Sequence, residues 1–205
     1  MIAFIIGGSG SGKSEYAENL AVMLEPNTKI YIATMYPWDE ESKERIRKHR
    51  KMREKKKFET MECFYGLEKG VESFGKDTKE QTVFLDCMSN LLANEMYCEE
   101  GYVCKTNDND HVSDHILKGI DALCQKFQNV VIVSNDVFSD GVEYDKEMKT
   151  YLSALGKINE RIAKRADVVA EVICNIPLFN KGKNQVEELM ECLRTTKEEK
   201  DEHAL

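Results

Sequence analysis

The feature that most constrains this chain is a glycine-rich loop between an apolar run and an amphipathic segment. Residues 2–6 (IAFII) are apolar, and after them come Gly7, Gly8, Ser9, Gly10, Ser11, Gly12, Lys13 and Ser14. This G-x-x-x-x-G-K-S spacing is that of the phosphate-binding loop, or P-loop, which joins a strand to a helix. Glycines let successive backbone N–H groups turn toward phosphate oxygens. The pattern predicts nucleotide binding, with Lys13 on the outer phosphates and Ser14 on Mg²⁺.

Length and composition limit the class of protein. The chain has 205 residues, 41% of them hydrophobic and 32% charged, which is typical of a globular domain. No apolar run approaches the roughly 20 residues of a membrane span. We expect one P-loop domain over residues 1–194, followed by a charged, frayed tail over 195–205.

The cysteines and the first apolar run indicate the cellular compartment in which we expect the protein. Seven cysteines are scattered without a C-x-x-C pair, which favours free thiols in a reducing environment. The run at residues 2–6 leads straight into the P-loop, so it does not have the organisation of a secretory signal. We therefore expect the protein in the cytoplasm.

Short apolar runs alternate with longer helical patterns along the chain. Strands are expected at residues 2–6, 29–34, 82–86, 130–134 and 168–173. Helices are expected at residues 13–24, 40–55, 88–97, 112–127, 146–164 and 185–193, with a surface loop at 99–110. Such alternation is typical of crossover units, so we predict a three-layer α/β P-loop NTPase domain with a mostly parallel, RecA-like sheet. Ligands should bind at the carboxyl ends of its strands.

One expected strand ends in a carboxylate. The run Val-Phe-Leu at 83–85 is followed by Asp86, which is the form of a Walker B element whose Asp orients Mg²⁺ or its water. The alternative is that Asp86 caps the helix expected to follow it.

The segment 43–57 carries ten Lys or Arg against two Glu, although the whole chain has a net charge of −8. Helical spacing puts Arg45, His49 and Arg53 on one face. Nearby positive charge disfavours the protonated imidazole, and a neutral imidazole beside a phosphate is a competent nucleophile. Two other interpretations stay open: a charged helix with a solvated histidine, and a basic helix that binds nucleic acid.

His111 and His115 are spaced for one helical face, with acidic residues beside them. Such a pair can ligate a metal ion. Two solvated histidines at the start of a helix are the simpler interpretation, and it is the one we expect.

Several segments occur in one order that matches a known family. They are IIGGSGSGKSEYAE, YIAT, R-I-x-x-H-R-x-x-R, FETMEC, FLDC with LLAN after it, VIVSND and GKINERIAKRADVV. In this respect the chain, from residue 1 to about 178, resembles the adenosylcobinamide kinase / adenosylcobinamide-phosphate guanylyltransferase family of cobalamin biosynthesis. The resemblance implies an enzyme that phosphorylates adenosylcobinamide and then transfers GMP from GTP onto that phosphate, through a covalent adduct on His49.

The same resemblance implies the partners and the nucleotide contacts. Mg²⁺ with GTP or ATP, a corrinoid substrate and a closed homo-oligomer such as a trimer are expected, whereas nucleic acid is not. Arg45 would support the phosphates, and either Glu62 or Asp86 could accept the paired N–H donors of guanine. GTP would contact the P-loop and a further set of residues: Ala33, Thr34, Met35, Met52, Arg53, Glu54, Lys55, Glu62 and Asp86.

The chain departs from the family pattern after VIVSND. The family continues with G-x-G-[IV]-V-P, whereas this chain reads VFSDGVEY, and its histidine helix lacks the usual R-P-x-x-W. These departures concern the kinase half and the corrinoid more than the guanylyl transfer. Two alternatives therefore remain beside the resemblance: a diverged P-loop kinase for another small molecule, and a nucleotide-dependent nucleic-acid-binding module.

Overall fold

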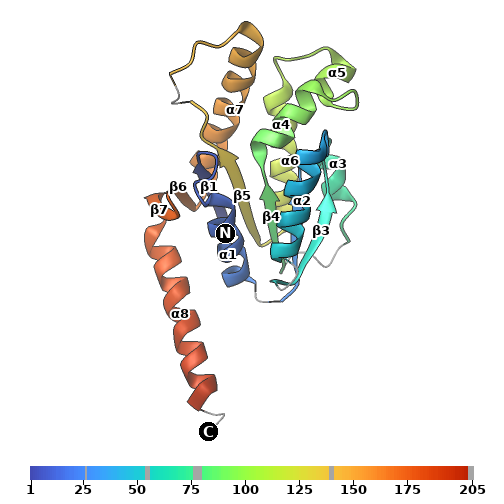
Figure 1. The fold of residues 1–205 in the computed structure, drawn as a ribbon. Coiled ribbons are helices and arrows are strands. Elements are labelled where there is room, and N and C mark those ends of the chain that lie inside the picture. Colours follow the sequence, from blue (N-terminus) through green and yellow to red (C-terminus); the bar gives the residue numbers. More distant parts are fainter. Residues whose placement is uncertain (26, 54–55, 76–79, 139–140, 203–205) are drawn as a thin grey trace.

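The computed structural model describes residues 1–25, 27–53, 56–75, 80–138 and 141–202. The side chains at positions 45, 48, 49, 52 and 194–202 lie outside this description, as do residues 54 and 55 of the predicted site. The described residues contain one seven-stranded sheet with the order β3-β2-β4-β5-β1-β6-β7 (Figure 1). The strands are β1 (Ile2–Gly7), β2 (Lys29–Ala33), β3 (Phe58–Glu62), β4 (Thr82–Asp86), β5 (Asn129–Asn135), β6 (Val168–Ile173) and β7 (Ile176–Lys181).

Neighbouring strands are parallel except for β6 and β7, which form an antiparallel hairpin. Strand β5 lies between the P-loop strand β1 and strand β4, which ends in Asp86. The carboxyl ends of β1, β4 and β5 therefore meet at one edge of the sheet, where the P-loop begins.

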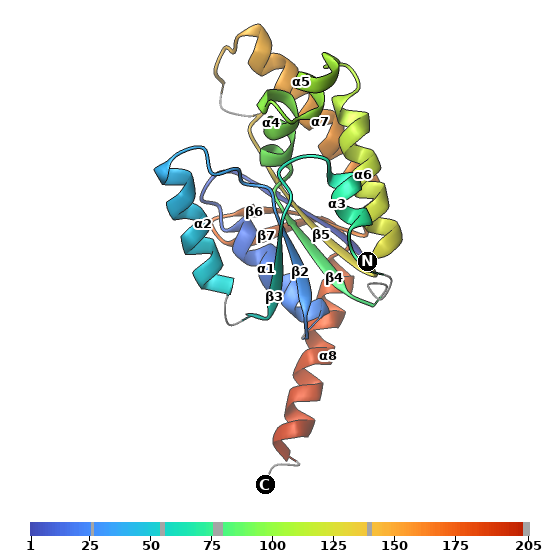
Figure 2. The same cartoon turned by 90° about the vertical axis from the view of Figure 1, so that its right-hand side faces the viewer.

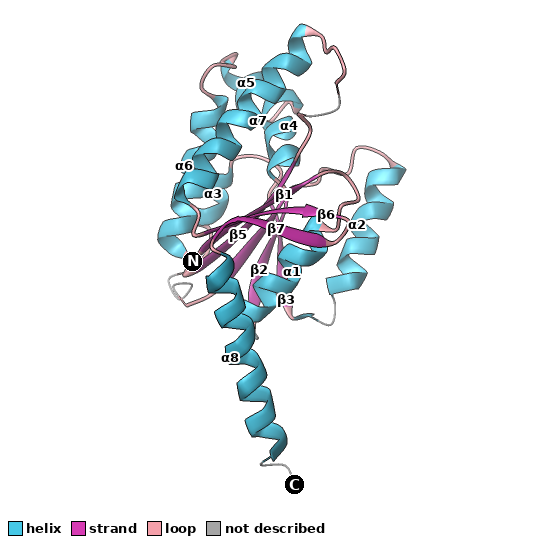
Figure 3. Cartoon of the chain, turned by 90° about the vertical axis from the view of Figure 1, so that its left-hand side faces the viewer, coloured by secondary structure: helices cyan, strands magenta, loops and turns pink. Residues whose placement is uncertain are grey.

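Helices cover both faces of the sheet. On one face lie α3 (Leu67–Glu72), α4 (Met88–Tyr97), α6 (Val112–Lys126) and α7 (Lys146–Arg165), and the short α5 (Tyr102–Thr106) follows α4. On the other face lie α1 (Lys13–Leu24) and the first part of α8 (Lys183–Glu202). Helix α2 (Glu40–Arg53) stands on the same side as α1, near the P-loop end of the sheet (Figures 2 and 3).

The apolar core divides in two because the central strands are buried on both faces. Val83 and Leu85 of β4 join the cluster under α3, α4, α6 and α7, whereas Phe84 joins the cluster under α1. The predicted three-layer α/β architecture with a mostly parallel sheet is confirmed.

Most expected elements are present. The differences concern the two edge strands, two short helices and the end of the last helix. The prediction missed β3, β7 and α3, and it was wrong for residues 99–110, where helix α5 interrupts the expected loop. Helix α8 continues to Glu202, past the end expected at residue 193. All three views show α8 projecting beyond the sheet (Figures 1, 2 and 3). Within the described residues, no helix combines the length and the apolar character needed to cross a membrane.

Candidate nucleotide site

The P-loop has the backbone that its glycines predict. Gly10 and Gly12 have φ angles of 72° and 90°, a region that is costly for residues with a Cβ atom. Lys13 is buried, and its Nζ donates a hydrogen bond of 2.9 Å to the carbonyl oxygen of Gly8, at the start of the loop. Helix α1 begins at Lys13, so its N-terminal N–H groups point toward the loop. The result is a ready anion-binding site.

The turn of the β6–β7 hairpin supports the P-loop from outside. Cys174 and Asn175 have φ angles of 50° and 65°, and the Asn175 N–H donates to the Ser11 carbonyl oxygen at 2.8 Å. A Cβ atom on Gly12 would lie 1.6 Å from Asn175 Oδ1. Glycine at position 12 is thus required both by its φ angle and by this close approach.

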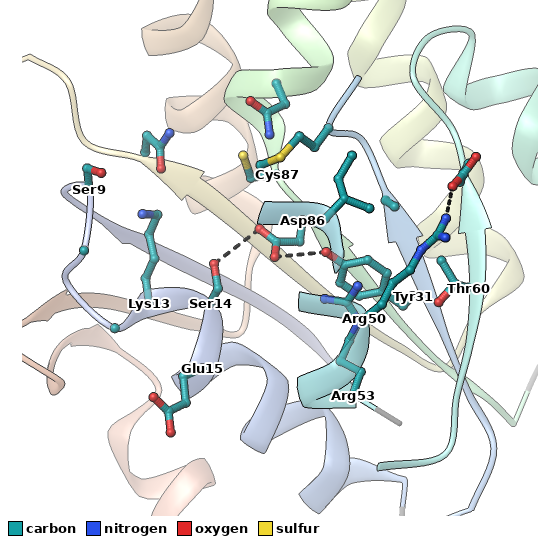
Figure 4. A pocket seen from close by; sticks show the side chains of 18 residues that line it. Ser9, Lys13, Ser14, Glu15, Tyr31, Arg50, Arg53, Thr60, Asp86 and Cys87 are labelled. Carbon is teal, nitrogen blue, oxygen red and sulfur yellow. Dashed lines mark hydrogen bonds and ion pairs between the residues drawn. The ribbon is translucent and has the colours of Figure 1, made fainter. Parts of the chain in front are cut away.

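Asp86 connects the P-loop to the floor of the site. Its Oδ1 accepts a hydrogen bond from Ser14 Oγ at 3.3 Å, and its Oδ2 accepts one from the Tyr31 hydroxyl at 3.1 Å (Figure 4). Burial first, and Asp86 second, raise the pKa of Tyr31, so the phenol keeps its proton and remains a donor. Cys87 is the N-cap of α4, so Asp86 is not the helix cap that the sequence left open. Ser14 and Asp86 are hard oxygen donors of the kind that Mg²⁺ prefers.

Beside the P-loop lies a cavity of about 540 Å³. Its walls come from the loop, from the carboxyl ends of β2 and β4, and from α2. Among the described side chains of α2, Ile46, Arg50 and Arg53 line the cavity, so they mark a helix face that is turned toward it (Arg50 and Arg53 are labelled in Figure 4). With about 3.6 residues per turn, position 49 falls on this same face. The side chain of His49 lies outside the described residues.

Arg53 is the most unusual side chain of the cavity. It is only 5% exposed, and its guanidinium carbon lies 3.5 Å from the centre of the Tyr31 ring. Its Nε and Nη1 are buried without a hydrogen-bond partner among the described residues. Because a buried cation with unused donors is costly, this guanidinium is a strong candidate to bind an anion in the cavity.

Glu62 lies at the end of β3 and lines the same cavity. Its Oε1 forms an ion pair with Arg50 Nη2 of α2. Both side chains are about half exposed, so water screens the pair and its contribution to stability is small. The pair nevertheless joins α2 to the far wall of the cavity, away from Asp86.

Most predicted site residues meet at this cavity. Its lining includes Ser9, Gly10, Gly12, Lys13, Ser14, Ala33, Met35, Arg53, Glu62 and Asp86. Gly7, Gly8, Ser11 and Thr34 are not among the lining residues. Thr34 is fully buried; its Oγ1 donates to the Cys87 carbonyl oxygen at 2.8 Å and accepts from the Cys87 N–H at 2.7 Å. In this structure Thr34 therefore supports the turn after β4. The side chains of Arg45 and Met52, and residues Glu54 and Lys55, lie outside the described part.

Sequence reasoning missed several lining residues, among them Tyr31, Arg50, Thr60, Asn90 and Asn135. The strand YIAT and the basic helix both contribute residues to the predicted site. Only the packing of α2 against the site end of β2 identifies Tyr31 and Arg50 as lining residues, and a pattern along the chain carries no such information.

Of the two histidines at the start of α6, His111 agrees with the expectation that both are solvated and His115 does not. His111 is exposed and contacts Asp108, with Nδ1 3.0 Å from Oδ2. His115, in contrast, stacks on Tyr102 with ring centroids 4.4 Å apart and lies 3.4 Å from buried Glu95. The expectation is wrong for His115 because α5, which the sequence did not reveal, covers it.

The comparison with known families shows to which family the chain belongs. The family model described as "Cobinamide kinase / cobinamide phosphate guanyltransferase" matches residues 3–179. The chain belongs to this family. It is therefore a transferase of the cobinamide kinase / guanyltransferase family, and the resemblance inferred from its motifs is confirmed.

Curated relatives agree with the family assignment. Two are named bifunctional adenosylcobalamin biosynthesis protein CobU, from Salmonella typhimurium and Escherichia coli, and each is 26% identical over 86% of this chain and 97% of the relative. The bifunctional protein CobP of Pseudomonas aeruginosa is 26% identical over 87% of this chain and 96% of its own length. This member of the cobinamide kinase / guanyltransferase family thus spans nearly the whole length of these relatives.

Proposed function

We propose that this protein phosphorylates the hydroxyl group of adenosylcobinamide and then transfers GMP from GTP onto the phosphate it has made. One observation carries the proposal: Ile46, Arg50 and Arg53 of α2 line the same cavity as the P-loop residues Lys13 and Ser14. A nucleoside triphosphate held by the loop would then have α2 along its length.

The P-loop supplies the phosphate chemistry. Backbone N–H groups of the loop and the start of α1 bind the phosphates, and Lys13 offsets charge on the outer ones. Ser14 and Asp86 would hold Mg²⁺, which neutralises charge on the phosphates when bound. Arg53 adds a buried positive charge from the α2 side, and its unused donors find acceptors in phosphate oxygens.

His49 is the proposed nucleophile of the guanylyl transfer. Its ring nitrogen attacks the α-phosphorus of GTP, a P–N bond forms, and the bond to the pyrophosphate oxygen breaks. The phosphate oxygen of the corrinoid then attacks the same phosphorus and releases the histidine. Arg45, one helical turn earlier, is proposed to support the phosphates during both steps.

Glu62 is the proposed reader of guanine, and Asp86 the proposed Mg²⁺ ligand. Asp86 is already hydrogen-bonded to the P-loop serine, whereas Glu62 lies at the far wall of the cavity. A carboxylate there can accept the two N–H donors of guanine, which adenine cannot offer in that arrangement. Glu62 would exchange Arg50 for the base when GTP enters.

Protein labelling tests this proposal. With GTP labelled at the α-phosphate and Mg²⁺, the wild type should acquire acid-labile, base-stable label, and His49→Asn should acquire none. His111→Asn removes an exposed histidine and serves as the matched control, which should label like the wild type.

Label that persists in His49→Asn would refute the nucleophile. No label in the wild type, together with nucleotide-dependent phosphorylation of a different small alcohol, would favour a diverged kinase instead. The closed homo-oligomer and the cytoplasmic location expected from the sequence remain predictions that belong to this proposal.

A further inference from the structure

A second cavity adjoins the P-loop. The role that we assign to this cavity rests on the proposed function. The cavity has a volume of about 470 Å³ and lies between the start of the loop, the end of β5 and the first turns of α7. Ser9 lines both this cavity and the nucleotide cavity. The two spaces therefore share the first part of the loop as a common wall.

The orientation of Lys13 indicates which phosphate would lie at this common wall. Lys13 Nζ is held 2.9 Å from the carbonyl oxygen of Gly8, next to Ser9. The lysine of a P-loop contacts the β- and γ-phosphates. The terminal phosphate of a bound nucleotide is thus expected at the Gly8–Ser9 end, which faces the second cavity.

A carboxylate lies at the same place. Asp136 comes directly after the end of β5, and its N–H donates to the Gly7 carbonyl oxygen at 3.0 Å, so it is fixed beside the first residue of the loop. One carboxylate oxygen accepts a hydrogen bond of 3.3 Å from the Phe138 N–H. Among the described residues, no hydrogen bond occupies the other oxygen, and the side chain lines the cavity.

The remaining wall is mainly apolar. Val137, Met148, Tyr151 and Leu152 contribute to it, together with Tyr144. Tyr151 directs its hydroxyl away to the Ser89 carbonyl oxygen at 3.1 Å, so it offers mainly its ring to the cavity. Such a wall suits a ligand with a substantial apolar surface, and it contrasts with the charged nucleotide cavity.

We propose that this second cavity is the phosphoryl-acceptor pocket and that Asp136 is a catalytic residue of the kinase reaction. The pocket takes an alcohol carried on a largely apolar body. The hydroxyl oxygen attacks the γ-phosphorus, a new O–P bond forms, and the bond to the β-phosphate oxygen breaks to release the nucleoside diphosphate. The hydroxyl proton passes to the Asp136 carboxylate, and water removes it later.

Kinetics with cobinamide and MgATP test the assignment. Asp136→Asn keeps the size of the side chain but cannot accept the proton, so kcat for phosphorylation should fall by roughly 100-fold or more, with little change in the KM for MgATP. Asp110→Asn makes the same change on the exposed surface and should match the wild type.

A binding measurement gives a second, independent readout. Met148→Glu places a charge in the apolar wall, so the affinity for cobinamide, measured by equilibrium dialysis, should fall at least roughly tenfold. The thermal shift produced by MgATP should persist in both variants, which shows that they are folded.

The outcomes separate this inference from the proposed function. If the wild type phosphorylates cobinamide and both variants do so equally well, the pocket assignment is overturned while the function stands. If the wild type binds cobinamide through Met148 but does not phosphorylate it, the cavity is a binding site without an acceptor role, so the pocket assignment and the proposed function both fail. If the wild type does not bind cobinamide at all, both fail.

Discussion

Arg53 is the residue for which we propose that ligand binding is favoured at the expense of stability. It is buried beside Tyr31, and two of its nitrogens have no partner among the described residues. The stacking on Tyr31 offsets only part of the cost of removing a guanidinium from water. In our interpretation, a phosphate oxygen supplies the missing partners.

The first prediction concerns this residue. Arg53→Met preserves the stem and removes the charge, so we expect an unchanged or higher melting temperature without nucleotide. The affinity for GTP should become roughly 10- to 100-fold weaker because a charged hydrogen bond to phosphate is lost. Calorimetric melting and GTP titration measure the two effects.

The exposed Arg50 provides the contrast. Arg50→Met breaks a screened ion pair with Glu62, so it should change the free energy of unfolding by less than about 1 kcal/mol. A large loss of stability in Arg53→Met without nucleotide would contradict the idea that this charge lacks partners in the free protein.

Among single residues, the sequence revealed those whose positions obey a local rule. Lys13, Ser14 and Asp86 could be predicted because a loop spacing and a strand end define them. Tyr31 could not, since an apolar strand offers several side chains and only the approach of α2 identifies the one beneath Arg53.

At the scale of elements, Glu95 of α4 organises two short helices. Its Oε1 accepts from the Gly66 N–H at 2.6 Å at the start of α3, and its Oε2 accepts from the Tyr102 N–H at 2.8 Å at the start of α5. Burial alone would raise the pKa of Glu95, but His115 and these two N–H groups outweigh it and hold that pKa below its usual 4.5.

The second prediction rests on the direction of this shift. Because the pKa is lower in the folded state, Glu95 stabilises the fold above about pH 4.5, and this stabilisation is lost as the pH falls toward and through the lowered value. Glu95→Gln should therefore flatten the acid side of the plot of unfolding free energy against pH. At neutral pH the variant should be less stable by about 1–3 kcal/mol.

Urea denaturation over a range of pH measures this prediction. Glu68→Gln changes an exposed carboxylate of α3 and is the control. If the plot of unfolding free energy against pH kept the same slope at acid pH in Glu95→Gln, other carboxylates would be the main source of the acid dependence.

The third prediction compares two glycines of the P-loop. Gly10→Ala meets no atom within 4 Å and suffers only from its positive φ, at a cost of about 1 kcal/mol. Gly12→Ala has the same strain and also collides with Asn175, so it should cost more than about 2 kcal/mol. Urea denaturation measures the loss of unfolding free energy in each variant. Equal losses in the two variants would show that the hairpin turn shifts at little cost to accommodate the new Cβ atom.

The missed elements have a common physical cause. Strand β3 is at the sheet edge and mostly exposed, so it lacks the apolar run that marks β4. Helices α3 and α5 have six and five residues, which is too short to form alone, and the Glu95 carboxylate that caps them comes from a different helix. The long central elements could be predicted because their own sequences contain the apolar runs and periodic apolar positions that become buried.

For the whole molecule, the antiparallel edge strand β7 is a candidate contact surface. Ile176 and Leu178 are 61% and 50% exposed and point to the same face, since they are two residues apart. Natural proteins seldom leave such an edge uncovered. This surface supports the expected homo-oligomer.

The fourth prediction tests that surface. A double variant with Ile176→Lys and Leu178→Lys should elute with the mass of a monomer in size-exclusion chromatography with light scattering, whereas the wild type should have a larger mass. Glu188→Lys, an exposed change on α8, is the control. An unchanged mass in the double variant would show that the subunits contact each other through a different surface.

The strand order also dictates when the P-loop can become rigid during translation. Among the described strands, the neighbours of β1 are β5 and β6, which leave the ribosome more than a hundred residues later. At roughly 5–20 residues per second, β1 waits several seconds for its first neighbour. Because the P-loop follows directly after β1, we expect a nascent chain that has not yet exposed β5 to bind nucleotide more weakly than the folded protein.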